Sequence, residues 1–99
     1  MSLPYTYELS QEADNDLQDI YDHTHEHFGA QQAIDYLTGI EDLFHILCAH
    51  PHSGRARNEI RKGLRSISYV AHVVFYRIIE KRIRIVRVLH ASRDLPRYL

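Results

Sequence analysis

The sequence predicts an α+β domain in the order β-α-α-β-β-β, with a helical hairpin packed on a small antiparallel sheet. In the first half, apolar residues recur at helical spacing in two consecutive segments that Gly29 separates, which predicts the hairpin. In the second half, three segments are apolar at alternate positions or on both faces, which predicts the sheet. A chain of 99 residues is expected to form one domain over residues 1–99.

Residues 5–9 (YTYEL) are short, aromatic and alternating, which predicts a first strand. Ser10 follows where a helix N-cap belongs, and acidic residues occupy the first turn, where the helix dipole favours them. Gly29 is suited to end this helix because glycine readily adopts the left-handed conformation common at that position. The apolar stripe of this first helix comprises Ala13, Leu17, Ile20, Tyr21, Thr24 and Phe28.

A second helix is expected to begin near Ala30 and to end at His50-Pro51, because the residue before a proline disfavours the helical conformation. Its apolar stripe is wider, about 140° at 100° per residue, so that it can face the first helix and a sheet together. The stripe comprises Ala33, Tyr36, Leu37, Ile40, Leu43, Phe44, Leu47 and Cys48. The two helices are expected to pack as an antiparallel hairpin.

Residues 51–63 (PHSGRARNEIRKG) are polar and basic, and are expected to form a loop with room for one helical turn. Strands are expected at residues 64–68, 70–79 and 82–89, the second of them nearly apolar on both faces. The last strand loses its alternation from Val86 onward. This loss indicates either that both faces are covered there or that a β-bulge shifts the register.

The two halves of the chain carry opposite charge. Residues 1–50 contain ten acids and no Lys or Arg, whereas residues 51–99 contain all twelve cations and three acids, which gives −10 and +9. This asymmetry indicates either a basic face that binds an anionic partner or an attraction between the halves within the fold. One cysteine, no apolar run of membrane length and no leader pattern favour a cytoplasmic protein.

The histidines offer weak metal-binding chemistry. His23 and His27 have the i, i+4 spacing of a two-imidazole site, but no third ligand is fixed nearby, so we expect no metal and no cofactor. Phosphate loops, nucleophile elbows and cysteine clusters are absent from the sequence.

His90 ends the last predicted strand beside several arginines. A metal-independent ribonuclease would use His90 as acid or base and Arg65 or Arg87 on the phosphate. Tyr69 or Tyr76 would stack on a base. The alternative is structural, with His90 hydrogen-bonded locally and the arginines paired with Glu59, Asp94 and the acids of the two helices.

A set of short motifs in a fixed order resembles the toxins of the ParE/RelE superfamily, which belong to bacterial type II toxin–antitoxin modules. The resemblance covers almost the whole chain, and it implies the same β-α-α-β-β-β fold. The motifs are Ser10 and Ala13, Asp16-Leu17-x-x-Ile20-Tyr21, Phe28-Gly29-x-x-x-Ala33, Pro51-x-x-Gly54-Arg55, Gly63-Leu64-Arg65, Val74-x-Tyr76-Arg77 and Ile85-x-x-Val88-Leu89-His90-x-x-Arg93-Asp94.

The superfamily divides in function. RelE-like and YoeB-like members cleave messenger RNA on the ribosome, whereas ParE-like members are described as gyrase poisons without an established catalytic residue. The sequence resembles the ParE branch, because Val73 follows His72 where the ribonuclease branch commonly has Arg, and because the net charge is −1. The resemblance thus implies inhibition of DNA gyrase. A ribosome-dependent endoribonuclease and an antitoxin-binding protein without toxicity are the alternatives.

The resemblance also implies a ParD-like antitoxin whose C-terminal segment orders as it wraps the helices and sheet. Surplus apolar surface is expected on both faces of residues 70–79 and on the tail, residues 95–99. We expect the antitoxin to contact Tyr21, Phe28 and Tyr98, and we expect no membrane partner. Exposed cations that would bind gyrase, or alternatively the ribosome and its mRNA, are Arg57, Arg61, Arg65 and Arg93.

Overall fold

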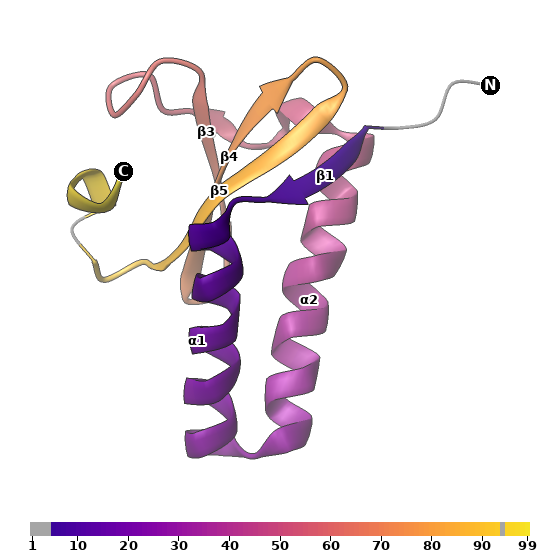
Figure 1. Ribbon diagram of the computed structural model, residues 1–99, viewed down its shortest axis with the longest axis vertical. Coiled ribbons are helices and arrows are strands. Elements are labelled where there is room, and N and C mark those ends of the chain that lie inside the picture. Colours follow the sequence, from indigo (N-terminus) through magenta and orange to yellow (C-terminus); the bar gives the residue numbers. More distant parts are fainter. Residues whose placement is uncertain (1–4, 94) are drawn as a thin grey trace.

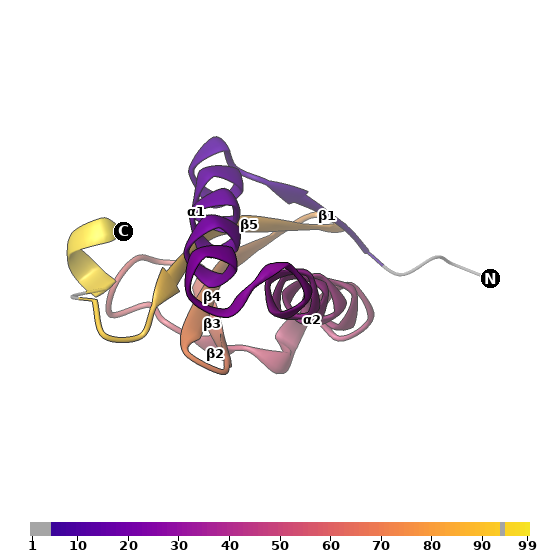
Figure 2. The ribbon, with the colours of Figure 1, turned by 90° about the horizontal axis from the view of Figure 1, so that it is seen from below.

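In a computed structural model, which describes residues 5–93 and 95–99, two antiparallel helices cover one face of a five-stranded sheet (Figures 1 and 2). The strand order is β1-β5-β4-β3-β2. This arrangement confirms the predicted α+β architecture. The elements are β1 (Thr6–Leu9), α1 (Gln11–Phe28), α2 (Ala30–Ala49), β2 (Arg55–Ala56), β3 (Leu64–Tyr69), β4 (His72–Ile79) and β5 (Arg82–His90), with 3₁₀ turns at Pro51–Ser53 and Leu95–Tyr98.

The helix boundaries follow the predicted signals. The Ser10 Oγ accepts a hydrogen bond from the Ala13 N–H at 2.9 Å, so Ser10 is the N-cap of α1. Gly29 joins the helices with φ of 92°, a region that side chains with a Cβ rarely adopt. Its N–H donates to the His25 carbonyl, and α2 ends before Pro51 as expected.

The sheet is mixed, not purely antiparallel as the sequence predicted. β1 pairs in parallel with β5, from Thr6 opposite Arg82 to Leu9 opposite Ile85, while β2 to β5 are antiparallel neighbours. The alternation of side chains in a strand has the same period in either direction, so residues 5–9 carried no signal of orientation. The two-residue β2 was missed because it is too short to show a period.

The two hairpin turns depart from the usual glycine and asparagine. Val70 has φ of 49° and Glu80 has φ of 55°, each at the first central position of a two-residue turn. This position requires positive φ in a type II′ turn, where glycine is favoured. The predicted third strand therefore begins at His72, two residues later than residues 70–79 indicated.

β5 contains the bulge, and both of its faces are covered, so the two explanations of its lost alternation hold together. Phe75 is opposite Arg87 and Tyr76 is opposite Ile85, which leaves Val86 as the extra residue. The first helix binds the backbone here: the Ser10 hydroxyl donates to the Val86 carbonyl at 2.7 Å. Beyond the bulge, Val88 packs in the core under the helices and Leu89 in the core on the opposite face.

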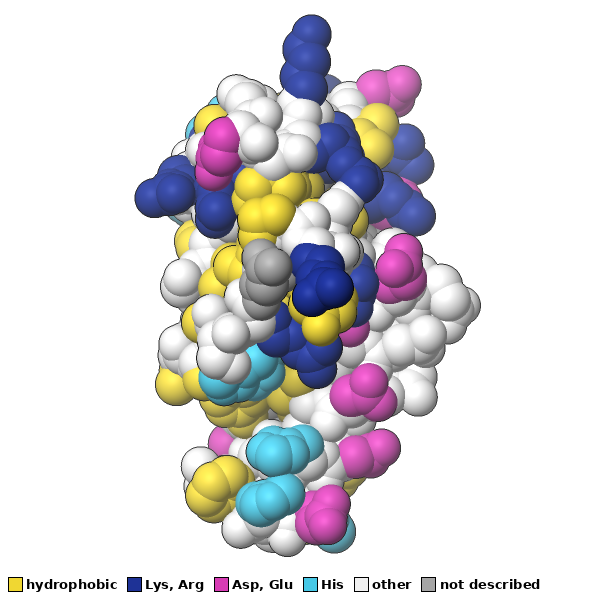
Figure 3. Space-filling view, turned by 90° about the vertical axis from the view of Figure 1, so that its left-hand side faces the viewer, with side chains coloured by type: hydrophobic (Ala, Val, Ile, Leu, Met, Phe, Trp, Pro, Cys, Tyr) yellow, Lys and Arg dark blue, Asp and Glu magenta, His cyan; other side chains and the backbone are white. Residues whose placement is uncertain are grey.

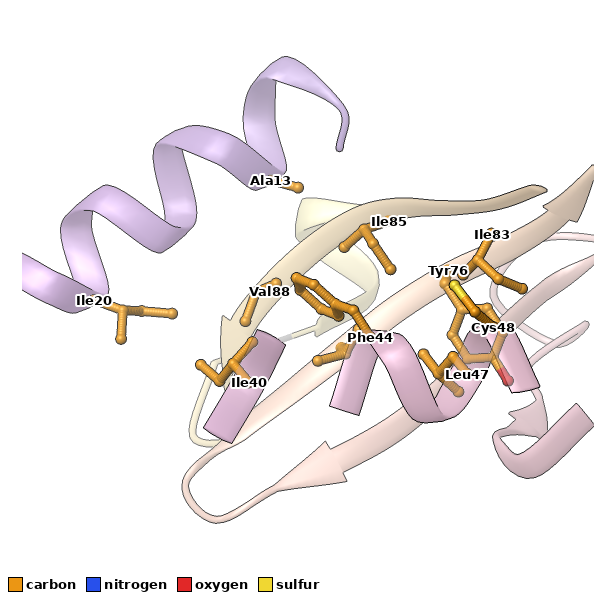
Figure 4. Close-up of a cluster of buried hydrophobic side chains, with 11 residues drawn as sticks. Ala13, Ile20, Ile40, Phe44, Leu47, Cys48, Tyr76, Ile83, Ile85 and Val88 are labelled. Carbon is orange, nitrogen blue, oxygen red and sulfur yellow. The ribbon is translucent and has the colours of Figure 1, made fainter. Parts of the chain in front are cut away.

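The main core lies between the helices and the sheet, with Phe44 and Tyr76 as its largest fully buried side chains (Figure 4). A second cluster of Leu64, Val73, Phe75 and Leu89 lies on the other face. Leu95 and Leu99 of the C-terminal turn pack against that second cluster. The expected apolar surplus is thus largely buried within the chain. No helix in the described ranges is long and apolar enough to cross a membrane.

Candidate functional site

A pocket of about 490 Å³ lies between α1 and the C-terminal end of β5, and we call it the His90 pocket. On the corresponding face of the molecule, histidines gather over α1 with arginines above them and acids along one border (Figure 3). The polar side chains that line the pocket include Asp16, Asp19, His23, His72, His90 and Arg93.

Two imidazoles meet edge to face in this pocket. The ring centroids of His72 and His90 are 5.3 Å apart, with an interplanar angle of 81°. The His72 Nδ1 lies 2.7 Å from the Tyr36 hydroxyl of α2. Burial lowers the pKa of His72, and the neighbouring His90 and His23 add to that effect. His72 is therefore protonated less readily than an ordinary histidine.

The tautomer of His90 follows from its neighbours. Its Nδ1 is 3.1 Å from the Ser92 backbone N and 2.7 Å from the Ser92 hydroxyl. Because a backbone N–H can only donate, Nδ1 accepts, and the proton of neutral His90 resides on Nε2. Neutral His90 can thus donate a hydrogen bond through Nε2 but cannot act as a base through that atom.

Arg87 is engaged in holding the first helix against the sheet. Its Nε and one terminal nitrogen donate to the two Asp16 carboxylate oxygens at 2.8 and 2.9 Å. Asp16 also accepts from the Val88 N–H at 3.0 Å. The hydrogen bond to Asp16 raises the pKa of Arg87. Both side chains are largely buried, with exposed fractions of 16% for Arg87 and 11% for Asp16. The two Arg87 N–H groups that could bind a phosphate are thus already bound to Asp16.

Arg65 lies far from His90, with which it was predicted to form a ribonuclease site. On β4, Arg65 is opposite Tyr76, whereas His90 is opposite His72, and four residues along a strand span about 13 Å. Arg65 donates to the Gly54 carbonyl at 2.6 Å. Only Arg87 and His90 of the predicted set share the His90 pocket. Tyr76 is fully buried, so the expectation that it stacks on a base is wrong.

Part of the basic half is neutralised within the fold, as the second explanation of the charge asymmetry proposed. Arg82 and Arg84 of β5 both donate to Glu8 of β1. Arg57 pairs with Glu59 at 2.7 Å, lies over the Phe75 ring and has a side chain only 17% exposed. The expectation that Arg57 is an exposed cation is therefore wrong.

A cluster of cations remains at the opposite end of the sheet from the His90 pocket, and we call it the basic loop surface. Within the described ranges, none of its members is in an ion pair. Arg61 is exposed there, whereas the predicted target-binding residue Arg93 lies apart from it, in the His90 pocket. The basic loop surface consists of Arg55, Arg61, Lys62, Arg65 and Arg77.

An apolar groove of about 290 Å³ lies between α1, α2 and β1. Tyr21 lines this groove together with Leu17 and with Ile34, which is 49% exposed. The other two predicted antitoxin contacts lie elsewhere. Phe28 is 67% exposed at the end of α1, and Tyr98 lies in the C-terminal turn, with Arg93 over its ring.

The paired histidines of the first helix stack on each other, with ring centroids of His23 and His27 4.2 Å apart. Across residues 5–93 and 95–99, no group of three or more His, Cys, Asp or Glu residues is arranged to hold a metal ion. Asp94, which completes the C-terminal motif and was a possible arginine partner, lies outside the described residues.

Comparison with known proteins agrees with the fold and motifs. Residues 7–95 match the family model described as ParE toxin of type II toxin-antitoxin system, parDE. The chain is 40% identical over 94 residues to Toxin ParE1 of Mycobacterium tuberculosis and 36% identical over 93 residues to Toxin ParE1 of Caulobacter vibrioides. Each alignment covers 94% of this chain and 96% of the relative.

Two solved structures share the fold at 22% identity. The chromosomal ParDE toxin–antitoxin system from P. aeruginosa gives a TM-score of 0.77, covering 91% of this chain and 98% of the other. The RelBE2 toxin–antitoxin complex from Mycobacterium tuberculosis gives 0.64, covering 89% and 99%. These matches confirm the resemblance inferred from the motifs: the chain belongs to the ParE toxin family of type II toxin–antitoxin systems.

Proposed function

We propose that this ParE-family toxin inhibits DNA gyrase by binding it and that a ParD-like antitoxin neutralises the toxin. The observation that carries the proposal is that neither predicted phosphate-binding arginine is available beside His90: Arg65 lies apart from it along the sheet, and Arg87 is held by Asp16. Val73 supports the same conclusion, because it is 8% exposed in the second core, at the position where the ribonuclease branch of the superfamily commonly has an arginine.

The basic loop surface is the part of the molecule best suited to an anionic target. It gathers cations without acidic partners among the described residues, and exposed Arg61 lies within it. Its counterpart on gyrase would be an acidic protein surface or the bound DNA. Charges at the edge of such an interface mainly increase the association rate and its dependence on salt.

One observation favours the endoribonuclease alternative. His90 shares its pocket with Arg87 and with Arg93, a cation that has no carboxylate partner within the described ranges. A supercoiling assay with purified gyrase and a primer-extension assay on translated message separate the two functions. We expect loss of supercoiling and an intact message. Site-specific cuts in mRNA with undisturbed gyrase would overturn the proposal, and activity in neither assay would indicate a protein that only binds antitoxin.

Two substitutions sharpen this comparison. Arg61→Ala is expected to reduce toxicity while the free energy of unfolding changes by less than about 0.5 kcal/mol, because exposed charges contribute little to folding. His90→Ala is expected to retain toxicity, since binding needs no proton transfer. A catalytic acid or base would instead contribute about 10²–10⁴ in rate. Growth after induction and urea denaturation measure the two quantities. Abolished toxicity in a folded His90→Ala protein would favour the nuclease.

The groove between α1 and α2 is proposed to bind a C-terminal segment of the antitoxin. It is mostly apolar, is not filled by any described residue, and is lined by the predicted contact Tyr21. Both structural neighbours named above come from toxin–antitoxin systems, which supports an antitoxin as the occupant. Asp22 and Glu41 stand on the two helices that form the groove, so we expect a segment with apolar residues at its centre and basic residues at its borders.

Ile34→Lys is expected to weaken antitoxin binding at least about tenfold, because it places a charge where an isoleucine would be buried by the partner. Ile46→Lys is the matched control, since Ile46 is 50% exposed on the same helix but outside the groove. Calorimetric titration with the protein of the neighbouring gene measures both affinities. Equal losses in the two variants would show that the groove is not the site.

A further inference from the structure

The His90 pocket presents hydrogen-bond donors that no acceptor among the described residues uses. The Ser92 N–H fixes the neutral His90 ring with its proton on Nε2, which makes that atom a donor. Arg93 lines the same pocket, and its guanidinium carbon lies 5.1 Å from the Tyr98 ring centroid. No carboxylate pairs with Arg93 in the described part of the chain. Arginine and imidazole N–H groups are characteristic donors to phosphate and carboxylate oxygens.

The two carboxylates that line the pocket differ in how strongly they repel an anion. Asp16 is satisfied by the Arg87 fork and by the Val88 N–H, so its charge is neutralised locally. Asp19 is the exposed carboxylate that lines the pocket without such a partner among the described residues. Its negative charge repels an incoming anion, and protonated imidazoles would offset that repulsion.

The charge of the pocket depends on pH. The charged groups that line it are Asp16 and Asp19 from α1 and Arg87 and Arg93 from β5 and the segment after it, and their charges cancel. Three imidazoles face the same space, from α1, β4 and β5: His23, His72 and His90. Each of these imidazoles gains a positive charge when it is protonated. Because the pKa of His72 is lowered, its proton is gained only at lower pH than in an ordinary histidine.

We propose that the His90 pocket binds a small oxyanion, a phosphate or carboxylate group, and that its affinity increases as the pH falls below 7. The bound oxygen atoms would accept from the His90 Nε2–H and from the Arg93 guanidinium, with Ile20, Val88 and Leu89 supplying the apolar part of the lining. The proposal requires neither gyrase nor ribosome as the target. It concerns ligand binding at the end of the sheet opposite the basic loop surface.

The full chain is titrated with sulfate at pH 5.5 and at pH 7.5, and binding is followed by NMR of the histidine side chains and backbone amides. Sulfate stands in for a phosphate group because its charge stays constant over this range. We expect Kd to be about tenfold lower at pH 5.5, since nearby unit charges in water-like surroundings each change affinity several-fold. A parallel titration with acetate identifies whether a phosphate or a carboxylate is preferred. Equal sulfate affinity at the two pH values would overturn the proposal.

Four variants locate the site. Arg93→Ala should weaken sulfate binding at both pH values, His90→Gln should remove much of the pH dependence, and Asp19→Asn should tighten binding at pH 7.5. Lys81→Ala is the control, because Lys81 is an exposed cation at the other end of β5. An Arg93→Ala protein that binds sulfate as Lys81→Ala does would contradict the proposal. Asp19 is exposed, so Asp19→Asn provides a test even if another variant unfolds.

Discussion

Asp16→Asn is expected to lower the free energy of unfolding by about 3 kcal/mol, because removing one partner of a largely buried ion pair leaves the other charge unpaired. Asp16 accepts two hydrogen bonds from Arg87 and one from the Val88 N–H. An asparagine of the same shape keeps one oxygen acceptor but turns an amide NH₂ group toward the donors of the other oxygen. The loss also releases α1 from the bulged part of β5. Urea denaturation measures the change.

Asp19→Asn is the matched control on the next turn of the same helix, where the carboxylate is exposed and has no ion-pair partner among the described residues. It is expected to change stability by less than about 0.5 kcal/mol. A double-mutant cycle with Arg87→Met isolates the pairwise energy. If Asp16→Asn cost no more than Asp19→Asn, the ion pair would not be what holds the helix to the sheet.

Tyr76→Phe is expected to lower the free energy of unfolding by about 2 kcal/mol, because it leaves buried hydrogen-bonding groups unpaired. The Tyr76 hydroxyl donates to the Pro51 carbonyl at 2.7 Å and accepts from the Gly54 N–H at 2.9 Å. These bonds fix the segment whose Gly54 carbonyl receives Arg65. The variant is therefore expected to loosen the basic loop surface as well, which hydrogen exchange of residues 51–57 would detect.

Tyr69→Phe serves as the comparison, because no described residue hydrogen-bonds to the Tyr69 hydroxyl, and it should unfold within about 0.5 kcal/mol of the parent. Gly54→Ala tests the same contact from the other side. A Cβ at that position would lie 2.6 Å from the Tyr76 hydroxyl and 2.8 Å from the Ser66 carbonyl oxygen, so overpacking is expected to destabilise the fold by about 1–3 kcal/mol. Equal stability of the Tyr76 and Tyr69 variants would refute this role of the Tyr76 hydroxyl.

The sequence came within one residue of predicting that His72 and His90 meet in the pocket. A two-residue turn at Glu80-Lys81 pairs Ile79 with Arg82 and so predicts which residues of the two strands meet. Without a bulge this register places His72 opposite Leu89; the extra residue Val86 moves it opposite His90. The lost alternation at Val86 was explained equally well by a bulge and by coverage of both faces. The sequence therefore could not show that the two histidines meet.

The basic half shows a different limit. Arg57, Arg61 and Arg65 have the same chemistry and lie within nine residues, and composition alone made them equivalent. In the structure the Arg57 side chain is partly buried over the Phe75 ring, Arg65 binds backbone carbonyls, and Arg61 is exposed. Their environments depend on partners that are distant in the chain, such as the Phe75 ring, which no local pattern indicates.

The sequence by itself determined the features that depend on neighbouring residues. The Ser10 cap, the Gly29 junction and the helix end before Pro51 arise from local backbone chemistry, and the two apolar stripes follow from helical periodicity. The order of motifs was enough to indicate the toxin family. The tertiary structure alone decided that β1 runs parallel to β5, that Arg65 and His90 lie apart, and that Arg87 is held by Asp16. Each of these features depends on strand register and on contacts between segments that are distant in the sequence. Such contacts form only when the whole chain folds.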